Sequence, residues 1–292
     1  MLGPNRYAFR MSSQIKEHLF RFWLAVPELR FWRSRPRVPL IVAMTSYPGR
    51  AQKAWIAVET LLRQTVAPEK LILVLNEEEF PNRVIPRRLS RRLRRGLQIM
   101  WLEKNGKSFD KLLPVRAEFP TRTIVTVDDD KYFPRTLLAS LFEASKSHPG
   151  VIIGARGWKI QQSSSGEIHY GDNWVRAHPG DLGYALLTPG GNGCLYPPFS
   201  LDDSVDRYPD AQKVCPSADD IWFWGAAMKK QTPFFCLGMR PHRPITHSSE
   251  AGALSSVNKK LNDVQFQAAL DFFSIREFLN DAVARNEVDR HA

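Results

Sequence analysis

The chain has 292 residues, of which 43% are hydrophobic and 24% charged, and its formal net charge is +11. These values are those of an ordinary globular protein with an ample core. No apolar run approaches the ~20 residues that cross a bilayer, and no signal-peptide cleavage pattern follows the N-terminus. The three cysteines contain no C-x-x-C pair, which argues against a disulfide framework or a zinc site. We therefore expect a cytoplasmic protein.

Most of the positive charge lies in two segments. Residues 1–37 contain eight Lys and Arg against two Glu, and residues 83–95 contain seven Arg and no acid. Residues 14–26 gather aromatic and aliphatic side chains on one helical face, which is typical of a helix that lies on an anionic membrane surface. We predict a basic amphipathic extension over residues 1–37 in peripheral membrane contact; the alternative is a helix that packs on the domain. Because the charge is local, we expect no nucleic acid partner.

From residue 38 onwards, short apolar runs alternate with stretches of helical periodicity. Strands are predicted at residues 40–44, 71–75, 97–101, 124–127 and 151–153. Helices are predicted at residues 50–63, 86–95, 109–119 and 136–145. Strands separated by helices indicate βαβ units and a mainly parallel sheet, which binds ligands beyond the carboxyl ends of its strands.

The second half, residues 156–292, is less regular. It contains a Gly/Pro-rich loop at residues 188–198 and a helical pattern at 219–230. A short strand pattern at 234–239 and a long helical pattern at 258–282 follow. No long linker separates this half from residues 38–155, so we predict two halves of one domain.

Three carboxylates, Asp128, Asp129 and Asp130, end the apolar run at 124–127. Adjacent negative charges repel one another unless a cation lies among them. In an extended chain Asp128 and Asp130 point to the same side, and two hard oxygen donors there suit Mg²⁺ or Mn²⁺ that carries a substrate's phosphates. The alternative is a solvated turn that caps the helix following Pro134.

Five segments, taken in order, resemble GT-A glycosyltransferases, most closely the inverting, family-2-like enzymes of bacterial polysaccharide synthesis. They are residues 42–50 (VAMTSYPGR), 60–65 (TLLRQT), 104–108 (KNGKS), 128–130 (DDD) and 218–222 (ADDIW). The resemblance covers roughly residues 38–270. It implies an α/β fold with a Rossmann-related, mainly parallel sheet flanked by helices and an acceptor-binding lobe. Residues 38–155 would then bind the nucleotide sugar, and residues 156–292 the acceptor.

The resemblance also implies which residues hold the donor and the metal. The donor-binding residues would be Thr45, Ser46, Arg50, Asn76, Lys107, Lys111, Asp128 and Asp129. In the family an Asp usually ends the second strand and recognises the base, whereas Asn76 stands here. Asp130 and Asp128 would bind Mn²⁺ or Mg²⁺, with His247 as a third ligand.

Catalysis requires a carboxylate that takes the proton from the acceptor hydroxyl as it attacks the anomeric carbon. Asp219 and Asp220 are the candidates, and we favour Asp220; both could instead stabilise a helix N-terminus through its dipole. Four residues are expected on the acceptor side: Trp174 and Trp222, which are suited to stacking on sugar rings, and Gly191 and Asn192 of the Gly/Pro-rich loop.

The predicted function is metal-dependent transfer of a hexose from a nucleotide-diphosphate sugar to a hydroxyl of a glycan or glycolipid acceptor. Two alternatives remain open. A Mg²⁺-dependent nucleotidyltransferase or phosphohydrolase would also gather carboxylates around a metal. A non-catalytic nucleic-acid-binding protein would use the arginines of residues 83–95, and its affinity would fall steeply with salt.

Overall fold

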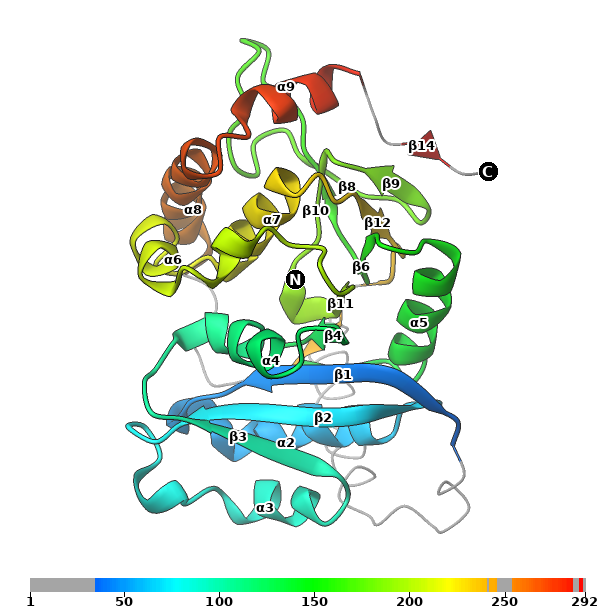
Figure 1. Cartoon of the computed structure of the whole chain (residues 1–292), viewed down its shortest axis with the longest axis vertical. Coiled ribbons are helices and arrows are strands. Elements are labelled where there is room, and N and C mark those ends of the chain that lie inside the picture. Colours follow the sequence, from blue (N-terminus) through cyan, green and yellow to red (C-terminus); the bar gives the residue numbers. More distant parts are fainter. Residues whose placement is uncertain (1–34, 241, 246–253, 286–288, 291–292) are drawn as a thin grey trace, which may run out of the picture.

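The computed structural model describes residues 35–240, 242–245, 254–285 and 289–290. These residues form a nine-stranded sheet with helices on both faces, and two smaller sheets (Figure 1). The predicted fold class, a mainly parallel α/β sheet flanked by helices, is confirmed.

The large sheet contains β1 (Arg37–Thr45), β2 (Ala67–Asn76), β3 (Leu97–Leu102), β4 (Thr123–Thr126), β6 (Ile152–Gly154), β9 (Asp181–Gly183), β11 (Cys194–Tyr196), β12 (Phe234–Cys236) and β14 (Asp289–Arg290). The smaller sheets pair β5 (Lys131–Tyr132) with β13 (Arg243–Pro244), and β7 (Trp158–Lys159) with β8 (Val175–Arg176) and β10 (Leu186–Leu187). The helices are α2 (Pro48–Leu62), α3 (Arg87–Leu93), α4 (Leu113–Glu118), α5 (Leu137–Ser147), α6 (Tyr208–Val214), α7 (Asp219–Lys229), α8 (Leu254–Phe272) and α9 (Arg276–Ala284). Short 3₁₀ helices are η2 (Pro81–Arg83), η3 (Lys107–Lys111), η4 (Gly190–Asn192) and η5 (Asp203–Asp206).

The strands follow one another across the large sheet in the order β14-β9-β12-β6-β11-β4-β1-β2-β3. Strands β3, β2, β1 and β4 run parallel. The next strand, β11, is antiparallel to both β4 and β6, so β6 runs in the same direction as β4, and β12 is parallel to β6. The carboxyl ends of these six parallel strands therefore lie along one edge of the sheet.

Alternation along the strands explains why both faces are covered. In β1, Leu40, Val42 and Met44 pack in the core that α2, α3 and α5 cover, whereas Ile41 and Ala43 pack in the core under α4, α7, α8 and α9. Because both faces are apolar, the strand reads in sequence as a continuous hydrophobic run, as expected for a parallel sheet.

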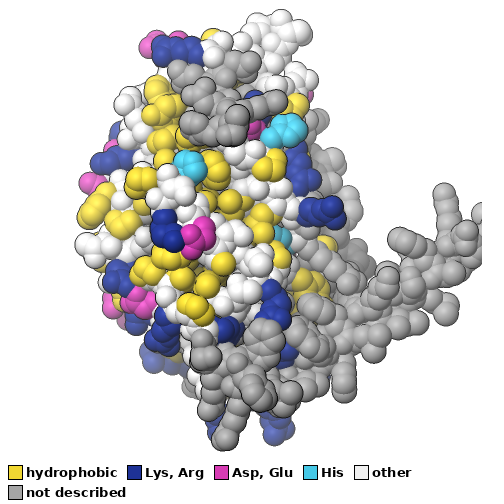
Figure 2. Space-filling view, turned by 90° about the vertical axis from the view of Figure 1, so that its right-hand side faces the viewer, with side chains coloured by type: hydrophobic (Ala, Val, Ile, Leu, Met, Phe, Trp, Pro, Cys, Tyr) yellow, Lys and Arg dark blue, Asp and Glu magenta, His cyan; other side chains and the backbone are white. Residues whose placement is uncertain are grey.

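The arginine-rich segment folds back onto α2. The buried carboxylate of Glu59 accepts hydrogen bonds from Arg92 Nε at 3.0 Å and from Arg95 Nη1 at 2.6 Å. The guanidinium of Arg92 also lies over the ring of Trp55, 4.6 Å from its centroid. Arginines of this segment thus hold α3 against α2 through ion pairs and a cation–π contact. Figure 2 shows Lys and Arg side chains spread over one face of the molecule, with several at the end that contains these helices.

Two predicted helices are divided in the structure. The pattern at 109–119 forms η3 and α4, and the long pattern at 258–282 forms α8 and α9, separated by a turn in which Ser274 has a φ of 54°. The turn allows Phe273 and Ile275 to be buried in the same core. Among the described residues, no helix has the length and apolarity needed to span a membrane. Residues 1–34, most of the predicted N-terminal extension, lie outside the described residues.

Candidate active site

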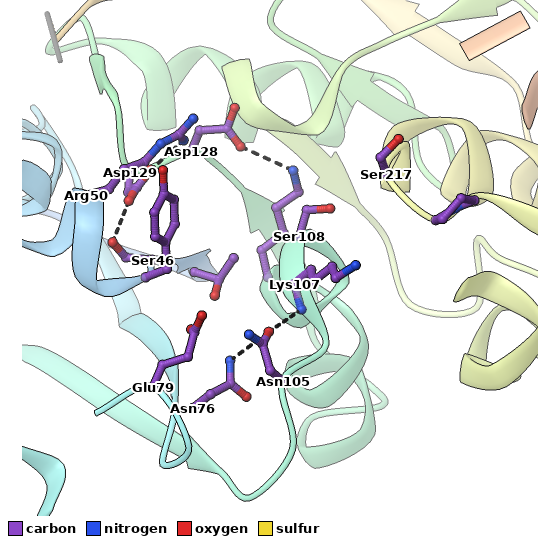
Figure 3. Close-up of a pocket in the computed structure, with 14 residues that line it drawn as sticks. Ser46, Arg50, Asn76, Glu79, Asn105, Lys107, Ser108, Asp128, Asp129 and Ser217 are labelled. Carbon is purple, nitrogen blue, oxygen red and sulfur yellow. Dashed lines mark hydrogen bonds and ion pairs between the residues drawn. The ribbon is translucent and has the colours of Figure 1, made fainter. Parts of the chain in front are cut away.

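A cavity of about 510 Å³ opens where β1, β2 and β4 end (Figure 3). All eight residues expected to bind the donor line it, together with six that the sequence analysis did not single out. The fourteen are Thr45, Ser46, Tyr47, Arg50, Asn76, Glu79, Asn105, Lys107, Ser108, Lys111, Asp128, Asp129, Pro216 and Ser217. Three of these six, Tyr47, Asn105 and Ser108, belong to segments that resemble the GT-A family, so the sequence could have indicated them.

One end of the cavity is built from amides and acids. Asn76 ends β2, and its Nδ2 donates to Asp110 Oδ2 at 3.0 Å. Burial raises the pKa of Asp110 to about 6, although Asn76 and the Gly106 amide both donate to it. Asn76 Oδ1 is buried and has no hydrogen-bond partner among the described residues. Figure 3 shows Glu79 and Asn105 beside Asn76.

The three successive aspartates lie at the other end, and each meets a cation. Asp129 is 2% exposed; it accepts from Ser46 Oγ at 2.5 Å and from Arg50 Nη1 at 3.1 Å. The same Arg50 nitrogen lies 3.2 Å from Asp130 Oδ2. Asp128 instead pairs with lysines. Strand alternation does not apply to Asp128 and Asp130, because β4 ends at Thr126 and the chain turns at Asp129 and Asp130.

Two lysines surround Asp128. Lys111 Nζ lies 3.2 Å from Asp128 Oδ1, and Lys131 Nζ lies 2.6 Å from Asp128 Oδ2. Burial alone would raise the pKa of Asp128, but the two ammonium groups outweigh burial and lower it. For Lys111, burial would lower the pKa, and the neighbouring carboxylates instead raise it well above its usual value. Both groups are therefore charged at neutral pH.

Lys111 also connects the aspartate triplet to the acidic start of α7. Its Nζ lies 2.7 Å from Asp219 Oδ2, so this buried ammonium bridges Asp128 and Asp219. The next residue, Asp220, accepts a hydrogen bond from the Gly190 amide at 2.8 Å. Burial, followed by the charge of Asp219, raises the pKa of Asp220 to about 6. Of the two carboxylates, Asp219 is the one held in an ion pair.

The predicted acceptor loop lies against these carboxylates. The Gly191 carbonyl accepts from the Asp128 amide at 3.1 Å, and a Cβ at Gly191 would overlap the Asp128 carboxylate. Asn192 accepts through its carbonyl from His242 Nε2 at 2.7 Å. Glycine is required here because the backbone approaches the Asp128 side chain so closely.

Neither of the two tryptophans predicted on the acceptor side lines this cavity. Trp222 is 0% exposed and donates through Nε1 to the Val205 carbonyl, so the prediction that it stacks on an acceptor sugar is wrong. Helix α7 is buried on nearly all sides, which helical periodicity could not reveal. Trp174 is half-buried against Tyr170 and Phe266 and does not line the cavity. His247 lies outside the described residues.

The carboxylates at this end of the cavity partly suit a divalent cation. Asp130 Oδ1 is buried and has no hydrogen-bond partner among the described residues, which is the environment that a bound cation would satisfy. The described part of the chain contains no group of three or more His, Cys, Asp or Glu arranged to hold a metal. Mg²⁺ and Mn²⁺ sites that act on phosphates need only one or two carboxylates, because water and substrate oxygens complete the coordination.

No model of a protein family matches this chain, nor does any curated protein sequence. Among solved structures, S. aureus TarS residues 1–349 in complex with UDP-GlcNAc has a TM-score of 0.53 and 12% identity over 85% of this chain and 71% of that chain. Another structure of TarS 1–349 has a TM-score of 0.45, with 14% identity over 82% of this chain and 73% of that chain. 4-Diphosphocytidyl-2C-methyl-D-erythritol synthase has a TM-score of 0.43, with 13% identity over 79% of this chain and all (100%) of that chain. The first similarity exceeds a TM-score of 0.5, and it shows that the chain has the GT-A glycosyltransferase fold.

Proposed function

We propose that this protein is a metal-dependent, inverting glycosyltransferase that moves a hexose from a nucleotide-diphosphate sugar to a hydroxyl of a glycan or a lipid-linked sugar. The observation that carries the proposal is Asp220, a carboxylate with a pKa of about 6 that lies across the Gly190–Asn192 loop from Asp128. A general base works best when its pKa is close to the working pH, because it is then deprotonated and still basic.

The cavity has the polarity that a nucleotide sugar requires. Asn76 and Asn105 offer amide groups to the edge of the base at one end. At the other end, Arg50 and Lys111 supply positive charge for the diphosphate, and Lys107, whose amide binds Asn105, also lines the cavity. TarS, which shares the fold, has been solved with UDP-GlcNAc bound, and this supports a donor of the same class.

In the proposed reaction, Asp220 takes the proton of the acceptor hydroxyl while the hydroxyl oxygen attacks the anomeric carbon. The bond between that carbon and the diphosphate breaks, and the nucleoside diphosphate leaves with the bonding electrons. Arg50 and Lys111 would stabilise the departing negative charge, because fixed cations of this kind stabilise a transition state without reorganising. Attack opposite the leaving group inverts the anomeric configuration.

Asp130 would hold the Mn²⁺ or Mg²⁺, with Asp128 beside it and His247 as a further ligand from outside the described residues. When bound, the ion supplies a Lewis acid that neutralises charge on the diphosphate. Arg50 positions Asp130 for this role through the 3.2 Å ion pair.

The first test is a thermal-shift screen of nucleotide sugars and nucleoside diphosphates with and without Mn²⁺. A ligand at 100 times its Kd stabilises the native state by about 2.7 kcal/mol, which is readily detected. A stabilising nucleotide sugar is then incubated with glycan acceptors, and the product's anomeric configuration is determined by NMR. Release of phosphate without sugar transfer would instead support the nucleotidyltransferase or phosphohydrolase alternative. Absence of any nucleotide effect would refute the proposal.

A further inference from the structure

Two arginines near the active site have no acidic partner within the described part of the chain. Arg176 Nη2 donates to the Met239 carbonyl at 2.8 Å, and neither Arg176 nor Arg156 forms an ion pair there. Burial and the adjacent charge of Arg176 both lower the pKa of Arg156. Asp181, a fully buried acid of the same region, accepts from the His178 amide and pairs with neither guanidinium.

The pairing of strands gives the position of Arg156 relative to the active site. Cys194 of β11 pairs with Thr126 of β4 on one side and with Gly154 of β6 on the other. Thr126 and Gly154 therefore lie at the same level, two strand spacings or about 10 Å apart. Asp128 follows Thr126 by two residues and Arg156 follows Gly154 by two, so both lie beyond the same edge of the sheet.

Arg176 approaches this edge from a second segment. Trp158 of β7 pairs directly with Arg176 of β8, and the ladder continues through the Ala177 amide and the Gly157 carbonyl. Trp158 and Arg176 are direct cross-strand partners, so their side chains are on the same face of this sheet. Arg156 precedes β7 by two residues, and the charge of Arg176 acts on its guanidinium. Trp158 is 37% exposed. This face therefore presents Arg176 beside an exposed aromatic ring, with the Arg156 guanidinium close to Arg176.

A continuous set of basic groups connects this face to the site. His242 binds the carbonyl of Asn192, in the loop that contacts Asp128 and Asp220. Besides burial, the charges of Lys131 and Arg156 lower the pKa of His242, which means that both cations lie close to it. On the acceptor side of Asp128, positive charge thus extends from Lys131 to the arginines.

Building on the proposed function, we propose that Arg156 and Arg176 bind a phosphate group of the acceptor, beyond the sheet edge at which Asp128 lies. Two guanidiniums that have no acidic partner among the described residues suit phosphate, because their planar N–H groups bind its oxygens bidentately. Trp158 provides a surface on which the neighbouring sugar ring of the acceptor stacks. The donor's own phosphates occupy the cavity on the other side of Asp128, so the two anions do not compete.

The test uses NMR of protein labelled with ¹⁵N in its tryptophan indoles, with the Trp158 signal assigned by W158F. The protein is saturated with UDP and titrated with methyl phosphate. We expect a saturable shift of the Trp158 signal in the wild type, and at least tenfold weaker binding in R156Q/R176Q. The matched control R91Q/R94Q removes the same charge from exposed positions of α3 and its C-terminal end and should bind as the wild type does.

Equal affinity in R156Q/R176Q and the wild type would overturn the proposal. If the double variant unfolds, R176Q alone, at an exposed position, provides the comparison. Failure of every nucleoside diphosphate to bind would refute the proposed function, whereas the Trp158 titration reports on the subsite independently.

Two further probes distinguish the source of the phosphate. Tighter binding of decyl phosphate than of glycerol phosphate at Trp158 would assign it to a lipid-linked acceptor, and equal binding would assign it to a phosphate-containing glycan. If sedimentation with phosphatidylglycerol vesicles depends on the two arginines while methyl phosphate leaves Trp158 unshifted, the face is a membrane contact and the subsite proposal is wrong.

Discussion

The substitution Asp220→Asn should make the protein more stable and nearly inactive. The asparagine keeps the shape of the side chain and an oxygen that accepts from the Gly190 amide. It removes only the charge and the ability to take a proton. Because Asp220 is buried and adjacent to Asp219, its ionisation in the folded state is unfavourable, which is the reason for its raised pKa.

The magnitude follows from the shift of the pKa from 3.8 to about 6. Each pKa unit corresponds to 1.36 kcal/mol, so ionisation of Asp220 costs the folded state about 3 kcal/mol at most. Because the folded pKa is raised, the favourable contribution of the protonated form is fully present below pH 4 and is lost as the pH rises through 6. At pH 7.5 the free energy of unfolding of Asp220→Asn should therefore exceed that of the wild type by about 1–3 kcal/mol, and its urea midpoint should be higher. At pH 4 the difference should vanish.

Activity should change in the opposite direction. Loss of a positioned general base lowers kcat by about 10²–10⁴-fold, while the donor Kd stays unchanged because the donor contacts other residues. In the wild type, kcat should fall tenfold per pH unit below about pH 6, the pKa of Asp220. Urea denaturation, calorimetry with UDP and a pH profile of transfer measure the three quantities. Normal kcat in Asp220→Asn would refute the assignment, and lower stability at pH 7.5 would refute the account of its pKa.

Three other outcomes are expected. Asp130→Asn should abolish the Mn²⁺ dependence of UDP binding in calorimetry while the urea midpoint is retained; unchanged dependence would remove Asp130 from the metal site. Glu59→Gln should cost about 3–5 kcal/mol in urea denaturation, because it leaves buried arginines around a neutral amide; a loss below 1 kcal/mol would contradict this account. Deletion of residues 1–34 should reduce sedimentation with anionic vesicles and spare transfer to a soluble acceptor, and unfolding of the truncated protein would instead mean that the segment packs on the domain.

The sequence predicted the sheet well where the strands are long and buried on both faces. The apolar runs at 40–44 and 71–75 lie within β1 and β2, whose alternate side chains fill two separate cores. The order of strands beyond β4 was not predictable. Strand β11 enters antiparallel between β4 and β6; its three residues pair with β4 and two of them also pair with β6, although no local pattern marks them.

Most of the predicted residues that line the cavity follow strand ends or belong to the segments that resemble the GT-A family. The environment of buried charged residues was harder to predict from the sequence. Lys111 occurs in an ordinary polar segment, and its position between Asp128 and Asp219 depends on three parts of the chain that are distant in sequence. Trp222 shows the opposite case, since a tryptophan beside acidic residues suggested a sugar platform, whereas burial of α7 places it in the core.

The choice between Asp219 and Asp220 illustrates what the structure adds. In sequence both are acids at a helix start, and the choice between them was nearly even. In the structure Lys111 holds Asp219 in an ion pair, whereas Asp220 accepts a hydrogen bond from the Gly190 amide. Asp219→Asn should therefore destabilise the fold by about 1–3 kcal/mol, because it weakens a buried ion pair. It should also lower the pKa of Asp220, whose rise depends partly on the charge of Asp219. The acid limb of the kcat profile should then move to lower pH while activity at pH 7.5 changes little. If Asp219→Asn removes the acid limb and Asp220→Asn retains it, Asp219 is the base.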